Sequence, residues 1–110
     1  MSSTLQPCAT SNQLHAGLCL AISDPIRIHI LYLLAEHPYS VSQLVDLLKL
    51  PQSTISRHLR TLRDAALVNT RREGRNIHYS LGDSRVIEAL DLLRNVLCDR
   101  MSAHAELLNL

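Results

Sequence analysis

Apolar residues recur at spacings of three and four along most of this 110-residue chain, a pattern typical of amphipathic helices. Strand-forming residues (Val68, Thr70, Ile77 and Tyr79) instead flank a turn at 73–76 that contains Gly74, and this predicts a β-hairpin. The predicted fold is mainly α with one small β-hairpin. The expected helices cover 12–23, 25–36, a segment that opens at 40 and is closed by Pro51, the stretch 50–63, and 84–108, and the expected strands cover 67–72 and 77–81.

Residues at the ends of these segments support the assignment. Asp24 followed by Pro25 is typical of a helix start, because Asp caps free backbone amides and proline needs no donor there. Ser40 and Gln43 have the spacing of a capping box. Ser, Thr, Pro and Gln dominate the first residues, so we expect a flexible arm over 1–11 and one domain over 12–110. The residues expected to be buried in the second and third helices are Ile26, Ile30, Leu33, Leu34, Leu44, Leu47 and Leu48.

The segment 50–63 has two faces of opposite character. Ile55, Leu59 and Leu62 recur at +4 and +3 and should face a core. The opposite face holds small hydroxyls and guanidiniums, which suit close approach to base edges in the major groove of DNA. Its members are Ser53, Ser56, Arg57 and Arg60. After the helix at 40–50, this segment forms a predicted helix-turn-helix, and the hairpin beside it is a predicted wing.

Positive charge is concentrated around that segment. Residues 53–76 contain six arginines against Asp64 and Glu73, a local charge of +4 in a chain of net charge +1. The remaining residues, five basic and eight acidic, carry −3. Arginine donors match phosphate oxygens and guanine edges, so the segment predicts binding to double-stranded DNA. A solvated charged surface is the alternative, and it does not explain why the charge coincides with the predicted helix-turn-helix and wing.

Specific contacts follow from this interpretation. Ser53, Ser56 and Arg57 are expected at base edges, with Gln52 and Thr54 beside them. His58 belongs to the same DNA-binding helix. The residues expected mainly at phosphates are Arg60, Arg63, Arg72 and Arg75. A winged-helix module for protein interaction is the alternative from another class, but it would usually present apolar or mixed-charge residues at positions 53, 56, 57 and 60.

Length and composition limit partners and location. A single core is only marginally sufficient for a chain of this size, so burial of a further face against a second copy is expected. The segment 84–108 is more apolar than its own core requires, which favours a homodimer. No apolar run reaches the ~18 residues of a membrane span, and the start lacks a signal-peptide pattern, so a cytoplasmic protein is expected. The expected interface residues are Leu14, Leu18, Leu90, Leu93, Leu97 and Met101.

Three cysteines, Cys8, Cys19 and Cys98, form no closely spaced pair, which argues against a disulfide scaffold and a zinc finger. Three thiolates that can converge would suit As(III) or Sb(III), and also cadmium or lead. Thiol oxidation or reaction with sulfur species is a second interpretation, and packing as small apolar side chains is a third. No phosphate loop, nucleophile elbow or CxxC occurs, so neither an enzyme nor an obligatory cofactor is expected.

Three motifs together resemble one known family. They are Asp24-Pro25-Ile26-Arg27, Gln52-Ser-Thr-Ile-Ser-Arg-His-Leu59 with Leu62, and Gly74-Arg75-Asn-Ile-His-Tyr79. In this order and spacing they resemble the ArsR/SmtB family of bacterial winged helix-turn-helix repressors, over about residues 14–100. The resemblance implies a homodimer built on the first and last helices, a palindromic operator, and release by a metal, metalloid or thiol-reactive inducer. Ala66 departs from the glycine frequent after the recognition helix.

The resemblance also bears on the inducer. The family's Cys and Asp ligands of the third helix correspond here to Ser40 and Gln43, so that metal site is expected to be absent. The last-helix zinc ligands correspond to Asp83, Arg85, Val96 and Asp99, of which two cannot bind zinc as needed. A dithiol branch pairs two cysteines, and here Cys98 matches one whereas Tyr32 stands at the other. The expected function is therefore a repressor of the arsenite-sensing or thiol-sensing branch.

Overall fold

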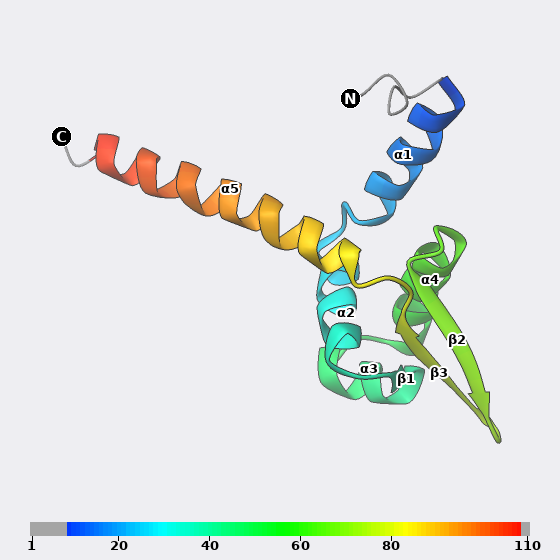
Figure 1. Ribbon diagram of the computed structural model, residues 1–110. Coiled ribbons are helices and arrows are strands. Elements are labelled where there is room, and N and C mark those ends of the chain that lie inside the picture. The colour runs from blue at the N-terminus through cyan, green and yellow to red at the C-terminus, as the bar shows by residue number, and fades with distance from the viewer. Residues whose placement is uncertain (1–8, 109–110) are drawn as a thin grey trace.

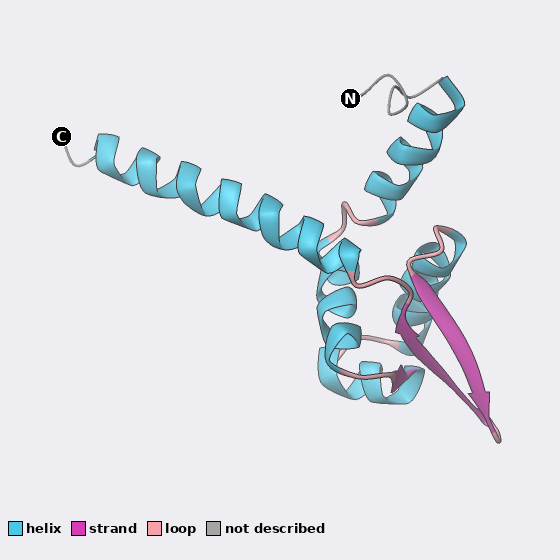
Figure 2. Ribbon diagram, in the orientation of Figure 1, coloured by secondary structure: helices cyan, strands magenta, loops and turns pink. Residues whose placement is uncertain are grey.

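The computed structural model describes residues 9–108, which form five helices and three strands (Figure 1 and Figure 2). The helices are α1 (Ala9–Ala21), α2 (Pro25–Glu36), α3 (Val41–Leu48), α4 (Gln52–Asp64) and α5 (Arg85–Leu108). The strands are β1 (Tyr39–Ser40), β2 (Val68–Glu73) and β3 (Asn76–Leu81). This order confirms the predicted mainly α fold with a hairpin between the fourth and fifth helices.

Helix α1 begins at Ala9 rather than at residue 12, so the end of the expected arm is helical. The polar residues of 9–12 contain no proline or glycine, and polarity alone does not prevent helix formation. The remainder of that arm, with Cys8, lies outside the described residues. At its other end α1 stops at Ala21, where the Ser23 hydroxyl donates to the carbonyl of Leu20 at 2.6 Å.

The predicted caps of α2 and α3 are present. Asp24 Oδ1 accepts hydrogen bonds from the amides of Ile26, at 2.8 Å, and Arg27, at 3.3 Å. Ser40 and Gln43 form the complete capping box, with side chain to backbone distances of 2.9 and 3.2 Å. These bonds satisfy amides that have no partner within their own helix and so fix where each helix begins.

The core lies where α2, α3 and α4 meet. Ile55, Leu59 and Leu62 of α4 are fully buried, which confirms the predicted inner face. They join Ile30 and Leu31 of α2 and Leu44 of α3. One expectation was wrong, because Leu47 is half exposed. Leu33 is partly buried against the core, and α2 also buries Leu31, which the sequence did not single out because a helix that is apolar on nearly all sides gives little indication of its inner face.

A three-stranded antiparallel sheet of order β1-β3-β2 completes the body. In the hairpin Thr70 pairs with Tyr79, and Gly74 adopts φ 63° at the turn. Strand β1 was not predicted from sequence. It has two residues, Tyr39 and Ser40, pairing with Tyr79 and His78, and such a length is too short to produce an alternating pattern.

Helices α1 and α5 extend away from the body (Figure 1). The radius of gyration is 17.1 Å, against about 13 Å for a compact chain of this length. Large apolar side chains along both helices are therefore exposed, among them Leu14 at 72% and Met101 at 62%. In the described part of the chain no single helix is long and apolar enough to cross a membrane. One pair of helical segments, Ser11–Ala21 and Pro25–Glu36, is long and apolar enough together, but it is bent by 87°, and this match rests on length and composition alone.

Candidate nucleic-acid interface

The turn between α3 and α4 sets the direction of the predicted recognition helix. Lys49 ends α3 in the left-handed conformation, φ 56°, with its amide donating to the carbonyl of Val45 at 2.8 Å. The carbonyl of Pro51 then accepts from the amides of Thr54 and Ile55, both at 3.1 Å. Lys49 thus ends α3, and Pro51, two residues later, is the N-cap residue of α4, so the turn needs only residues 49–51.

The predicted outer face of α4 is open to solvent. Arg57, Arg60 and Arg63 are exposed, as are the predicted partners Gln52, Ser53 and Ser56, while Thr54 is half-buried. The hydroxyl of Thr61 donates to the carbonyl of Arg57 and stays with its own helix. Because the opposite face is locked into the core, the helix presents hydroxyls and guanidiniums outward and has no freedom to rotate them away.

His58 is a correction to the expected set of DNA contacts. Its side chain is only 5% exposed, and Nδ1 lies 3.1 Å from Nη1 of Arg27 on α2. Burial lowers the pKa of His58 from its usual value of 6.5, the nearby Arg27 and Arg57 lower it further, and Asp24 opposes the shift. Sequence spacing contained the signal, since position 58 lies three residues after Ile55 and four before Leu62, on the inner face.

The wing carries its charge at the end distant from the core. Arg71, Arg72 and Arg75 are exposed around the turn at Gly74, and Arg71 pairs with Glu73 at 3.3 Å. Among the described residues neither Arg72 nor Arg75 forms an ion pair. Their guanidiniums therefore remain available for an external anion, as phosphate contacts require.

Helix α4 and the wing share a polar cleft of about 510 Å³. Ser56, Arg60 and Arg63 line it from α4, together with Asp64, and Tyr79 lines it from β3. Tyr79 was absent from the predicted site because its alternation identified it only as a strand residue. The cleft therefore lies between α4 and the hairpin, the two elements expected to bind DNA.

The cysteines lie away from that surface. Cys19 of α1 and Cys98 of α5 are free and exposed. Cys19 lines a groove of about 440 Å³ between α1, α2 and α5, and Leu97, the neighbour of Cys98, lines the same groove. Cys8 lies outside the described residues, so the predicted three-sulfur site is not described as a whole. Within 9–108 no three His, Cys, Asp or Glu residues gather as metal ligands.

The expected dimer surface divides into two parts. Leu14 and Leu18 on α1, and Leu93, Leu97 and Met101 on α5, are exposed. Leu90 is a correction: it is 6% exposed and packs into the core of its own chain. Residue 90 lies near the start of α5, where the helix still contacts the body. Its place in the apolar stripe did not show whether it packs against its own chain or against a second copy.

The model of the bacterial regulatory proteins of the arsR family matches residues 24–70. The transcriptional activator HlyU of Vibrio cholerae is 37% identical, over 74% of this chain and 75% of HlyU. The biofilm growth-associated repressor of Agrobacterium fabrum is 32% identical, over 76% of this chain and 71% of that protein.

Solved structures agree. HlyU from Vibrio cholerae superposes with a TM-score of 0.71 at 33% identity, covering 83% of this chain and 99% of that one. A homodimeric winged helix-turn-helix DNA-binding domain from Mycobacterium bovis gives a TM-score of 0.76 at 25% identity, covering 90% and 92%. The winged helix-turn-helix prediction is thereby confirmed, and these relatives are transcriptional regulators, not enzymes. The chain therefore belongs to the arsR family of bacterial regulatory proteins.

Proposed function

We propose that this DNA-binding transcriptional regulator is a homodimeric repressor, released from a palindromic operator by an inducer that binds its thiols. The observation that carries the DNA-binding part is the exposed polar and basic face of α4, with a polar cleft between it and the hairpin whose tip carries exposed arginines. Hydroxyls and guanidiniums at these positions match base edges and phosphates. A protein-interaction module would usually present apolar or mixed-charge residues at these positions.

The dimer is supported by the apolar surfaces of α1 and α5. Both helices project from the body, and their leucines would cost free energy if left in water. Pairing the same two helices in two copies by a two-fold axis buries these surfaces and turns the two α4 helices toward successive major grooves. The likeness to a homodimeric Mycobacterium bovis domain supports the same assembly.

The inducer site is proposed at the cysteines. Cys19 and Cys98 are free, exposed and located on the two helices expected to form the dimer. Cys8, eleven residues before Cys19, can supply a third sulfur. Three thiolates favour As(III) or Sb(III) over hard ions, and a soft metal ion is the next choice. Binding would hold α1 against α5 and favour a dimer geometry with low operator affinity.

Thiol oxidation is the second candidate, because both described thiols are exposed and therefore accessible to oxidants and reactive sulfur. In that case two sulfurs suffice, and Cys8 is dispensable. Both candidates predict release of DNA, but only the first predicts metalloid bound through sulfur.

The test uses the duplex that the wild-type chain selects from a random-sequence library. Arsenite is titrated against the complex for wild type and for Cys8→Ser, Cys19→Ser and Cys98→Ser, and X-ray absorption reports the arsenic ligands. We expect release in wild type, loss of release in the Cys19 and Cys98 variants, and three sulfur neighbours. Ala103→Ser, at an exposed position of α5, is the matched control and should respond like wild type.

Three outcomes would each contradict a different part of the proposal. If Cys19→Ser and Cys98→Ser both respond to arsenite like wild type, the proposed site is wrong. Release by a persulfide or peroxide with no response to arsenite favours the oxidation candidate. Failure of wild type to select any duplex contradicts the DNA-binding proposal itself.

A further inference from the structure

The side chain of Arg27, in the first turn of α2, contacts two other helices at once. Its Nε donates to the carbonyl of Ala21 at 2.6 Å, and Nη2 donates to the carbonyl of Leu20 at 3.4 Å. Its Nη1 lies 3.1 Å from Nδ1 of His58 on α4. One guanidinium therefore joins the end of α1 to the inner face of the recognition helix.

The chemistry of the pair determines the protonation of His58. A guanidinium has five donors and no acceptor, so Nδ1 of His58 must be the acceptor. The imidazole is then neutral and carries its proton on Nε2. The bond is charge-assisted, and its acceptor belongs to His58, which is only 5% exposed. Such a bond is stronger in a buried position than on the surface.

At the C-terminal end of α1, Arg27 supplies the positive charge that the helix itself lacks. The last turn of α1 has no basic residue, and its terminal carbonyls lie at the negative end of the helix dipole. The guanidinium comes from α2 and neutralises that end. Beyond it α1 and the end of α4 are separated by a groove of about 720 Å³, with Leu18 on one wall, Thr61 on the other and Arg27 also lining it. Arg27 is thus a polar connection across the gap.

We propose that Arg27 is a positioning residue for DNA recognition, which holds α4 through His58 and transmits the position of α1 to it. This inference rests on the proposed function, in which α4 enters the major groove. The two ends of the link are suitably located: Leu20 follows Cys19, and His58 follows Arg57, one of the residues expected at base edges. A shift of α1 on inducer binding would pull on the guanidinium and alter the orientation of α4.

Titration of His58 should break the link. The charged groups that face the imidazole are Asp24, Arg27 and Arg57. A protonated His58 loses the acceptor on Nδ1 and puts a second cation beside Arg27. Burial, with Arg27 and Arg57, lowers the pKa of His58 from 6.5, so the link is intact at neutral pH and fails in acid.

The experiment measures affinity for the library-selected duplex and for a random duplex between about pH 7.5 and pH 5.5. Arg27→Gln should weaken binding to the selected duplex about tenfold, the scale of one lost charge-assisted bond, with little change for the random duplex. Arg27→Lys should lose nearly as much, because one ammonium cannot make all three contacts. His58→Gln offers an amide oxygen to Arg27, so it should keep affinity at neutral pH and lose the decline in acid. His29→Gln, an exposed histidine of α2, is the matched control and should follow wild type.

Amide exchange tests the α1 side of the link in the whole protein. The amides of Ile22 and Ser23 bond back to the end of α1 at 3.1–3.3 Å. In wild type the selected duplex should increase their protection, whereas in Arg27→Gln it should not. Equal increases in both proteins, or an unchanged preference for the selected duplex in Arg27→Gln, overturn the inference. Arg57→Ala, measured in parallel, tests the proposed function separately, because an unchanged sequence preference in that variant contradicts the major-groove assignment itself.

Discussion

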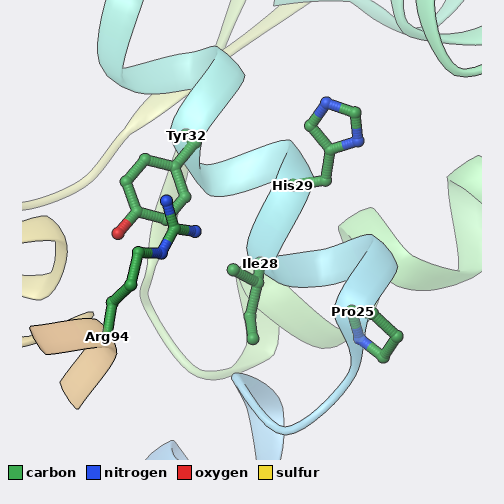
Figure 3. Close-up of a pocket in the computed structure, with 5 residues that line it drawn as sticks. All are labelled: Pro25, Ile28, His29, Tyr32 and Arg94. Atoms are coloured by element: carbon green, nitrogen blue, oxygen red, sulfur yellow. The ribbon is translucent and has the colours of Figure 1, made fainter. Parts of the chain in front are cut away.

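The phenolic oxygen of Tyr32 lies 2.5 Å from Oδ1 of Asp91 and joins α2 to α5 where α5 leaves the body. The guanidinium of Arg94, one turn further along α5, lies 4.5 Å from the centre of the Tyr32 ring (Figure 3). The family resemblance implies that Tyr32 stands where a dithiol branch would have a cysteine. At this position of the chain a hydrogen bond and a cation–π contact therefore connect α2 to α5.

We predict that Tyr32→Phe lowers the free energy of unfolding by about 0.5–1.5 kcal/mol, the usual contribution of one side-chain hydrogen bond. Chemical denaturation at neutral pH measures this loss. Tyr39→Phe is the matched control, since no hydrogen bond of its hydroxyl is found among the described residues. An equal loss in both variants would contradict a specific role for the bond to Asp91.

The same contact predicts a dependence on alkaline pH. The hydrogen bond to Asp91 raises the pKa of Tyr32 above its usual value of 10.0, burial adds to this, and Arg94 opposes it. A pKa raised by folding means that the contribution to stability is complete below pH 10 and is lost as pH rises through the folded-state value. Wild type should therefore lose stability above pH 10 more steeply than Tyr32→Phe in thermal melts at stepwise increasing pH.

Sequence patterns located most of the body. The helix ends at Asp24 and Ser40 were predictable because capping depends on a few neighbouring side chains, and the inner face of α4 followed from strict spacing. The two-residue strand β1 was not predictable, because it exists only through its pairing with Tyr79 and His78. A local sequence pattern thus predicts bonds between neighbouring residues but says little about pairing with residues distant in the sequence.

In the candidate site too, features set by neighbouring residues were predictable and those set by distant residues were not. The exposed residues of α4 were predictable, since a helix with one apolar face must expose the other. His58 was misassigned because its polarity outweighed its spacing, and its partner Arg27 is 31 residues away in sequence. Leu90 was misassigned because an apolar stripe on a long helix does not say where the body ends and a second copy begins.

Ala66, which follows α4, has φ 60°, a left-handed conformation that costs a residue with a Cβ about 1 kcal/mol. We predict that Ala66→Gly raises the free energy of unfolding by up to about 1 kcal/mol. Ala103→Gly, at an exposed position inside α5, should lower it by a similar amount, because glycine is a poor helix former. Denaturant midpoints of the two variants should thus move in opposite directions, and a shift of both in the same direction would disprove the strain.

Two arginines should separate sequence recognition from general attraction to DNA. Arg57→Ala is expected to cost about 1–3 kcal/mol on the selected duplex and to relax sequence preference. Arg75→Ala, at the tip of the wing, should weaken all duplexes alike and reduce the salt slope by about 1. Titrations at several salt concentrations measure both effects, with Arg100→Ala on α5 as the control for loss of one positive charge. Equal, sequence-independent losses for Arg57→Ala and Arg75→Ala would refute the assignment of roles.

The dimer surface can be tested by placing charge on it. Leu93 and Leu97 are 61% and 56% exposed on α5, so neither is needed to fill the core of its own chain. Glutamate at either position should leave the monomer folded but would bury an unpaired carboxylate between two copies. Burying that charge costs more free energy than the packing of the two helices contributes at this position. We therefore predict that Leu93→Glu and Leu97→Glu are monomeric by light scattering and bind the selected duplex at least about tenfold more weakly, since the two half-sites are no longer engaged together. Leu47→Glu is the matched control: Leu47 is 50% exposed on α3, away from α1 and α5, and its variant should remain dimeric. If Leu93→Glu and Leu97→Glu remained dimeric and bound DNA normally, α5 would not form the interface.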